Sequence, residues 1–475
     1  MPGACASQQV SPVNHRQHGI AKADSCKPTT AGKVDNKAAS EQDWQSGLRY
    51  PQVSEHTEET HPAAQNRDQA AQRDGLDHAL AGELAELRDR DLLRGLREVE
   101  SAQLPRITLD GRELLLFCSN NYLGLACHPE VVEAARLATE RWGASSGSSR
   151  LVSGHMTVHA ELEDKIARWK NQEAALVFST GYQANIGVIS SITGPGDLIV
   201  SDELNHASII DGARLSKAAT VVYRHNDIED LDRVLCENRG AGRVLVVTES
   251  VFSMDGDLAP LADISKACRR HGAWLMVDEA HGAGVFGKRG AGLVQELELE
   301  RQVQVHMGTL GKALGSFGAY VTGSRTLVDL LVNKARSIIF TTALPPSAAA
   351  AALAAIQVVE REPQRAAGLL ARATSLALAL REAGLEVPNA DSQIIPVLLG
   401  DAARAVATAD KLRAKGFYVA AIRPPTVARG TSRLRVSLMA THTGQEINAL
   451  RDAIIDCALD DSAGTNTAAN NGARA

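Results

Sequence analysis

Long hydrophobic runs are missing from this sequence: no apolar stretch approaches the roughly 18 residues that a membrane-spanning helix requires. The N-terminus, M-P-G-A-C-A-S-Q-Q, also lacks the apolar core of a secretory signal. The seven cysteines are odd in number, scattered and never spaced C-x-x-C, so they indicate neither a disulfide framework nor a metal site. The net charge of −6 argues against nucleic acid or an anionic membrane as a partner. These absences together predict a protein of the reducing cytoplasm.

Composition predicts an ordered centre between two polar ends. Of the 475 residues, 44% are hydrophobic, which suits two or three folded domains. Residues 1–74 are rich in polar residues and show no hydrophobic periodicity, so we predict a disordered extension there. Residues 462–475 predict a disordered tail for the same reason. Leucines at helical spacing then predict an N-terminal helical segment over residues 75–114.

Short apolar strands alternate with amphipathic helices from residue 115 onward. This alternation predicts an α/β fold in which helices cover both faces of a mostly parallel, seven-stranded sheet. We expect a large domain over 115–345 and a smaller C-terminal α/β domain over 346–461. The strands predicted for the large domain are 174–178, 198–200, 220–223, 244–248, 274–277, 303–307 and 319–322, with helices at 157–170 and 261–271. The elements predicted for the small domain are helices at 347–356, 364–383 and 402–415 and strands at 394–398, 417–420 and 433–438.

One lysine, Lys312, lies among glycines and small residues in the run V-H-M-G-T-L-G-K-A-L-G-S-F-G, which begins as an apolar strand. Lysine is seldom buried, and a lysine held in such a place has a lowered pKa because desolvation disfavours the ammonium form. It then becomes an amine nucleophile suited to a Schiff base, above all with pyridoxal phosphate (PLP). The alternative, a surface lysine in a glycine turn, stays open when this run is taken alone.

A carboxylate, Asp278, directly follows the apolar strand W-L-M-V and begins the run D-E-A-H-G-A-G. Burying its charge is costly unless a partner compensates it, and the protonated pyridine nitrogen of PLP is one such partner. His281 comes three positions later and could reach the phenolic oxygen of the same cofactor. The alternative is an aspartate that caps the next turn, followed by a surface histidine.

Other strand ends carry groups that suit a phosphorylated, aromatic cofactor. The turn S-T-G-Y-Q-A-N, residues 179–185, leads into a helix whose N-terminus would suit a phosphate. His206 could offer a flat ring for stacking, Ser253 could donate a hydrogen bond to the cofactor ring, and Thr309 could hold a phosphate oxygen. Each feature alone is a weak signal, and an isolated histidine is more often an ordinary loop residue. Their shared position at the carboxyl ends of parallel strands, where ligands bind, favours a common site.

Five motifs in this order, S-N-N-Y-L-G-L, L-N-H-A-S, E-S-V-F-S-M-D-G-D, V-D-E-A-H-G and T-L-G-K-A-L-G, resemble the α-oxoamine synthase family. These fold-type-I PLP-dependent transferases condense an amino acid with an acyl thioester, and the resemblance spans about residues 76–460. It implies PLP as the cofactor, with catalytic roles for Lys312 as the Schiff-base lysine, Asp278 at the pyridine nitrogen and His206 stacked on the ring. The other cofactor-binding residues that it implies are Ser253 and His281 near the phenolic oxygen, Gly181, Tyr182 and Thr309 at the phosphate, and Thr341 or Thr342 at the partner subunit's phosphate in a homodimer.

Two arginines bear on the substrates that the resemblance implies. Arg435, in S-R-L-R-V-S, would hold the amino acid's carboxylate, and Arg423, in A-I-R-P-P-T-V, would contact the carboxylate of a pimeloyl group. An outward-facing strand arginine and a loop arginine are the plain alternatives. The runs A-I-R-P-P-T-V and G-S-S-R-L-V-S-G-H are similar to the biotin-pathway branch, which uses L-alanine and a pimeloyl thioester of coenzyme A or acyl carrier protein.

Two other functions stay open at this point. The first is an enzyme of the same family that uses glycine and a different acyl thioester. The second is a regulatory protein of the PLP fold that has lost catalysis, which would usually carry a DNA-binding module. The acidic balance of the chain and the lack of a helix-turn-helix pattern in residues 1–75 count against the second.

Overall fold

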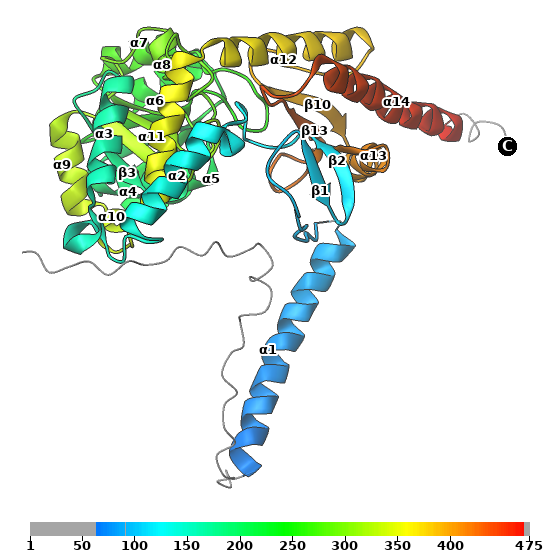
Figure 1. Cartoon of the computed structure of the whole chain (residues 1–475), viewed down its shortest axis with the longest axis horizontal. Coiled ribbons are helices and arrows are strands. Elements are labelled where there is room, and N and C mark those ends of the chain that lie inside the picture. The colour runs from blue at the N-terminus through cyan, green and yellow to red at the C-terminus, as the bar shows by residue number, and fades with distance from the viewer. Residues whose placement is uncertain (1–62, 91, 470–475) are drawn as a thin grey trace, which may run out of the picture. The chain divides into compact units, whose positions relative to one another are not determined.

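The computed structural model describes residues 63–90 and 92–469 (Figure 1). The chain divides between Asp77 and His78 into two compact units. All strands of the described residues belong to the second unit and form three sheets. None of the helices in the described part of the chain is long and apolar enough to cross a membrane.

The largest sheet has seven strands, and all seven were predicted from the sequence. They follow the order β3 (Ala174–Phe178), β9 (Ala319–Gly323), β8 (Val305–Thr309), β7 (Trp274–Asp278), β6 (Val244–Glu249), β4 (Leu198–Asp202) and β5 (Ala219–Tyr223). β9 runs antiparallel to both of its neighbours, β3 and β8, and every other pairing in this sheet is parallel. The predicted α/β fold with a mostly parallel sheet is therefore confirmed.

Helices cover both faces of this sheet because successive strand residues point to opposite sides. In β3, Leu176 packs in a core with one set of helices, and its neighbour Val177 packs in the core of the other face. The first set is α4 (Gly181–Ile192), α5 (Ala207–Ser216) and α9 (Arg325–Lys334). The second set is α3 (Thr157–Trp169), α6 (Ile228–Glu237), α7 (Leu261–His271) and α11 (Pro346–Arg361). The strands are buried on both sides, which explains their nearly continuous apolar sequences.

Two three-stranded sheets lie outside the large one. The first joins β10 (Ile394–Gly400), β13 (Ser432–Ser437) and β12 (Ala420–Ile422) by antiparallel pairing. The second joins β1 (Arg106–Leu109), β2 (Arg112–Leu116) and β11 (Phe417–Tyr418). The strand predicted at 417–420 is thus two short strands in different sheets. The remaining helices are α1 (Ala63–Asp89), α2 (Pro129–Trp142), α8 (Leu293–Glu296), α10 (Arg336–Ile339), α12 (Gln364–Glu382), α13 (Ala402–Ala414) and α14 (Gly444–Ala469), with single turns η2 (Leu125–Cys127) and η3 (Arg150–Gly154).

The predicted helical segment at 75–114 is wrong beyond Asp89, where α1 ends. The chain instead forms the hairpin of β1 and β2. Apolar side chains alternate into a small core along both strands, and Asp110 and Gly111 take the positive φ angles, 51° and 71°, that a tight hairpin turn needs. The D-G pair was the sequence signal for this hairpin.

Both predicted disordered ends need correction where the structure describes them. Residues 63–74 belong to α1, consistent with their high content of alanine, glutamine and arginine, which favour helix. Residues 462–469 continue α14, because extending a helix already packed upstream costs little per added hydrogen bond. Residues 1–62 and 470–475 lie outside the described residues.

Candidate active site

A cavity of about 200 Å³ opens where strands of the large sheet end. Ligand sites of parallel sheets lie at this edge because loops and helix N-termini meet there. Seven of the residues proposed from the sequence line it together. The full lining consists of Gly181, Tyr182, Asn185, His206, Ser208, Glu249, Asp278, Ala280, His281, Met307, Thr309 and Lys312.

Lys312 follows β8 by three residues and points its amine at a histidine. Its Nζ lies 2.6 Å from Nε2 of His281. Burial lowers the pKa of Lys312 to about 8, against the charges of Asp278 and Glu249, which raise it. Burial also lowers the pKa of His281 well below its usual range, and the charge of Lys312 adds to this. The pair therefore holds a neutral imidazole beside an amine that is poised to lose its proton near neutral pH.

Asp278 is the last residue of β7 and is buried, with 4% of its surface exposed. Its Oδ2 accepts a hydrogen bond from Nδ2 of Asn185 at 2.8 Å, and its Oδ1 accepts one from the backbone N–H of Ala280 at 2.8 Å. No cation of the described residues forms an ion pair with it. A buried carboxylate with two neutral donors and no cationic partner fits a protonated ring nitrogen, which is the group that PLP would bring.

A phosphate would find donors at the start of α4. The cap residue Thr180 accepts the N–H of Gln183 at 3.1 Å, so the first backbone N–H groups of the helix remain available at Gly181 and Tyr182. A Cβ at position 181 would lie 3.0 Å from Cε of Met307, so glycine allows the close approach of the backbone. These residues fit the phosphate of PLP.

His206 caps the N-terminus of α5 and lines the cavity. Its backbone N–H donates to Oε1 of Glu249 at 2.7 Å, and its Nδ1 lies 2.8 Å from Oγ of Ser208. Burial lowers the pKa of His206, with Asp278 raising it and Lys312 lowering it. The ring is therefore neutral, and Ser208 of α5 holds it in place through the contact at Nδ1. A neutral, fixed ring suits stacking on an aromatic cofactor.

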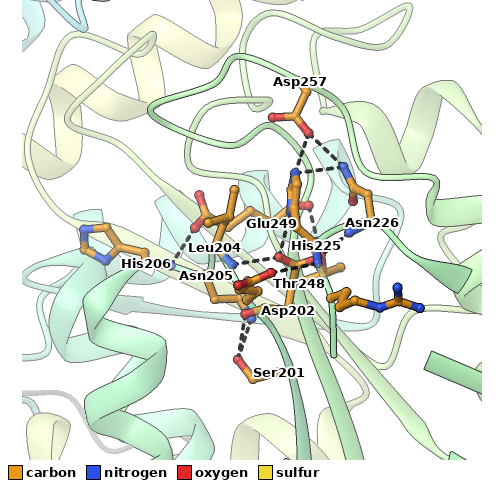
Figure 2. A network of polar contacts seen from close by, with 12 residues as sticks. Ser201, Asp202, Leu204, Asn205, His206, His225, Asn226, Thr248, Glu249 and Asp257 are labelled. Atoms are coloured by element: carbon orange, nitrogen blue, oxygen red, sulfur yellow. Dashed lines mark hydrogen bonds and ion pairs between the residues drawn. The ribbon is translucent and has the colours of Figure 1, made fainter. Parts of the chain in front are cut away.

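A second polar network holds the segment that precedes His206 (Figure 2). Asp202, at the end of β4, accepts hydrogen bonds from the N–H of Leu204 at 2.9 Å and from the N–H of Asn226 at 3.0 Å. His225 lies between two carboxylates, with 2.8 Å from Nδ1 to Oδ1 of Asp202 and 2.8 Å from Nε2 to Oδ2 of Asp257. Burial would lower the pKa of His225, but the two carboxylates outweigh it and raise the pKa to about 10.

Arg435 reaches the cavity through a tyrosine. Its Nη2 donates to the hydroxyl of Tyr122 at 3.2 Å, and that hydroxyl lies 2.6 Å from Nδ1 of His281. Arg435 also donates to Oδ1 of Asn120 and is buried, with 5% of its surface exposed. No carboxylate of the described residues pairs with its guanidinium. This leaves a buried positive charge without a protein anion.

Five residues proposed from the sequence do not line the cavity: Arg435, described above, and four others. Ser253 uses its backbone carbonyl to accept from Nε of Arg435 at 2.5 Å. The hydroxyl of Thr341 lies 3.5 Å from Nε2 of Gln183, and the carbonyl of Thr342 accepts from Ser179 at 3.3 Å. Arg423 donates to the carbonyl of Leu93 at 2.9 Å and lines a separate cavity of about 510 Å³. Their suggested roles stay predictions.

The sequence reasoning missed Glu249, Asn185 and Tyr122. Glu249 ends the apolar strand β6 as Asp278 ends β7, so the same signal, a carboxylate after an apolar run, was available. Asn185 lies in the quoted turn and helix start S-T-G-Y-Q-A-N, and Tyr122 lies in S-N-N-Y-L-G-L. Nothing in those runs shows that the two side chains reach Asp278 and His281.

Comparison with known proteins agrees with this geometry. The family model "Aminotransferase class I and II" matches residues 112–454. The 8-amino-7-oxononanoate synthase of Geobacter sulfurreducens is 52% identical over 374 residues, which cover 78% of this chain and 96% of the relative. Serine palmitoyltransferase from S. paucimobilis, solved with bound PLP–myriocin, is 33% identical with a TM-score of 0.76 and covers 80% of this chain and 96% of its own. The solved 8-amino-7-oxononanoate synthase from Francisella tularensis is 29% identical with a TM-score of 0.64. The match covers 72% of this chain and 97% of that structure's chain.

These similarities confirm the resemblance that the five motifs suggested and confirm PLP as the cofactor. The cavity contains the residue types that PLP needs: an amine of lowered pKa, a buried carboxylate that forms no ion pair within the described part of the chain, and a glycine-containing helix N-terminus. The chain therefore belongs to the aminotransferase class I and II family and, within it, to the PLP-dependent 8-amino-7-oxononanoate synthases.

Proposed function

We propose that this chain condenses L-alanine with a pimeloyl thioester and releases 8-amino-7-oxononanoate, CO2 and the free thiol, as a step of biotin biosynthesis. The observation that carries the proposal is the 52% identity to an 8-amino-7-oxononanoate synthase over 96% of that relative's length. The thioester is one of coenzyme A or of acyl carrier protein. We place the reaction in the cytoplasm.

The chemistry divides between the cofactor and the chain's own residues. PLP, when bound, supplies an electron-withdrawing ring that stabilises negative charge at the Cα of an amino acid. Asp278 would keep a proton on the ring nitrogen, because its carboxylate is buried and the described residues that donate to it are neutral. The amine of Lys312, with its lowered pKa, takes the proton from Cα and returns it later. The neutral ring of His281 holds that amine in place.

The substrate carboxylates need cationic partners. Arg435 is proposed to bind the carboxylate of L-alanine, because its guanidinium is buried and pairs with no carboxylate of the described residues. Arg423 is proposed to contact the pimeloyl carboxylate. Its guanidinium donates to the carbonyl of Leu93 and forms no ion pair with a carboxylate of the described residues.

The remaining roles rest on a homodimer with shared active sites, which we also propose. Thr341 and Thr342 would then reach the phosphate in the partner subunit, and Ser253 would approach the phenolic oxygen of PLP. We keep the division into a large PLP-binding domain, 115–345, and a small domain, 346–461, as part of the same proposal. The three sheets support it, because the seven-stranded sheet uses only residues 174–323.

The test begins with the visible absorbance of the purified protein and its product with pimeloyl thioester. We expect bound PLP, a spectral change with L-alanine, and 8-amino-7-oxononanoate by mass spectrometry. Lys312→Ala should abolish product, and Lys266→Ala, which changes an exposed lysine paired with Asp263, should not. A spectral response and product with glycine or L-serine but not with L-alanine would reject the proposed substrate and keep the family.

A further inference from the structure

Two carboxyl side chains meet in the cavity on neighbouring strands. Glu249 ends β6, Asp278 ends β7, and the two residues are direct partners in the parallel pairing of these strands. Both are buried, with 3% and 4% of their surfaces exposed. Partner residues of adjacent strands are about 5 Å apart, so two ionised carboxylates at these positions would repel each other strongly in a place poor in water.

We infer that Glu249 works in this pocket as a neutral carboxylic acid, which fixes the backbone of His206 and leaves the negative charge to Asp278. No proposed step of the reaction uses Glu249. The inference deepens the proposed function and rests on it only in that PLP is the ligand of the pocket.

The hydrogen bonds decide which of the two groups carries the proton. Asp278 accepts two N–H donors, from Asn185 and Ala280, each at 2.8 Å. Glu249 accepts one, from the backbone of His206 at 2.7 Å, and its Oε2 makes no hydrogen bond to the described residues. Donors stabilise a carboxylate, so the charge belongs on Asp278 and the proton on Glu249. The paired acids of other enzymes divide one proton in the same way.

Burial and the charged groups around Glu249 also favour its protonated form. Burial raises the pKa of Glu249 well above its usual range, and the charges of Asp278 and Asp202 add to this. Lys312 and the N–H of His206 oppose it. Burial lowers the pKa of Lys312 itself to about 8, against the charges of Asp278 and Glu249, so the opposing charge of this amine is lost as the pH rises through about 8.

Glu249 acts on the cofactor through His206. Figure 2 shows the carboxyl group of Glu249 reaching the backbone of His206, whose ring points away from it. His206 is the N-cap residue of α5, and its ring lines the cavity. The hydrogen bond from its backbone N–H to Glu249 therefore fixes the position of that ring. Glu249 is therefore a positioning residue.

The test compares Glu249→Gln with Glu249→Ala, using Glu237→Gln as a control that changes an exposed glutamate paired with Arg233. The amide of glutamine can accept the same N–H and carries no charge. We expect Glu249→Gln to bind PLP within about threefold of the unchanged protein and to keep the pH dependence of its visible absorbance. Glu249→Ala should bind PLP roughly tenfold more weakly or worse, because the N–H of His206 is left unpaired.

Infrared difference spectra give a readout that does not depend on activity. The spectrum of the unchanged protein minus that of Glu249→Gln should show the carbonyl stretch of a protonated carboxylic acid at neutral pH, with or without PLP. The Glu237→Gln difference should show a carboxylate. A missing acid band, or a Glu249→Gln variant as weak in PLP binding as Glu249→Ala, would overturn the inference. Failure of the unchanged protein to bind PLP would instead reject the proposed function, and the infrared band would still decide this one.

Discussion

The Nζ of Lys312 lies 2.6 Å from Nε2 of His281, and on the other side of the same ring Nδ1 lies 2.6 Å from the hydroxyl of Tyr122. One imidazole thus connects the amine that we propose for the chemistry with the phenol that Arg435 contacts. His281 stays neutral, because burial and then Lys312 and Arg435 lower its pKa well below its usual range. A neutral ring can accept a hydrogen bond on one nitrogen and donate from the other.

The pH at which PLP enters the protein should report the amine of Lys312. Only the neutral amine attacks a carbonyl, so the rate of PLP binding to the PLP-free protein should rise with pH and level off above about 8. Rapid-mixing absorbance measures this rate. Lys266→Ala should give the same profile. A rate that keeps rising toward the ordinary pKa of lysine, near 10.5, would contradict the lowered pKa.

Tyr122→Phe should lower kcat/KM for L-alanine and leave PLP binding unchanged. The change removes the hydroxyl between His281 and Arg435, and both partners are buried. Leaving them unpaired costs about 1–3 kcal/mol, which corresponds to a roughly 5- to 150-fold loss of kcat/KM. Steady-state kinetics with L-alanine measures the loss, and the visible absorbance of bound PLP should be retained.

Tyr418→Phe is the matched control for that change, because Tyr418 in β11 packs against the small core beside β1 and β2. It should leave kcat/KM for L-alanine unchanged. If both variants lose activity equally, the effect belongs to folding and the link from Arg435 through Tyr122 to His281 has no role in catalysis.

Much of the candidate site could be predicted because its signals are local. A lysine among glycines and an aspartate directly after an apolar strand are unusual wherever they occur, and Lys312 and Asp278 indeed line one cavity. Parallel pairing explains how they meet: β7 and β8 are neighbours, and their carboxyl ends lie at one edge. The same logic located all seven strands of the large sheet.

What could not be predicted depends on packing between distant segments. Nothing near Tyr122 in the sequence shows that its hydroxyl meets His281 and Arg435, which come from different sheets or loops. The strand at 417–420 was taken as one, yet Phe417 pairs with Leu115 and Ala420 pairs with Arg435. The point at which the strand divides depends on the strand with which each half pairs. The local sequence does not show which strand that is.

Lys170→Met should destabilise the protein far more than most lysine changes. Lys170 and Glu279 form an ion pair that is almost completely buried, with 1% and 0% of the side chains exposed. Glu279 follows Asp278 and also accepts the N–H of Val294 at 3.0 Å, so the pair anchors the segment after β7. Removing the cation leaves a buried charge uncompensated, which costs about 3–5 kcal/mol. Thermal unfolding of the PLP-loaded protein should show a clear fall in Tm.

Lys165→Met supplies the comparison, because Lys165 pairs with Glu360 at a more exposed place, with 21% and 23% of the side chains exposed. We expect that change to lower the free energy of unfolding by about 1 kcal/mol or less. The double variant Lys170→Met/Glu279→Gln should recover part of the lost Tm, since it removes the unpaired charge. Equal Tm values for Lys170→Met and Lys165→Met would refute the importance of the buried pair.

His225 should make stability fall in alkaline solution. Its pKa is about 10 in the folded protein, because Asp202 and Asp257 outweigh the effect of burial, whereas an unfolded histidine has a pKa near 6.5. A group with a raised folded pKa stabilises fully below the unfolded value and loses that contribution as the pH rises from about 6.5 to 10. The Tm should therefore decrease over this window. In His225→Gln, which keeps hydrogen bonding without the titrating charge, Tm should be lower at neutral pH and depend less on pH. Parallel slopes for the two proteins would show that His225 does not carry its proton between the two carboxylates.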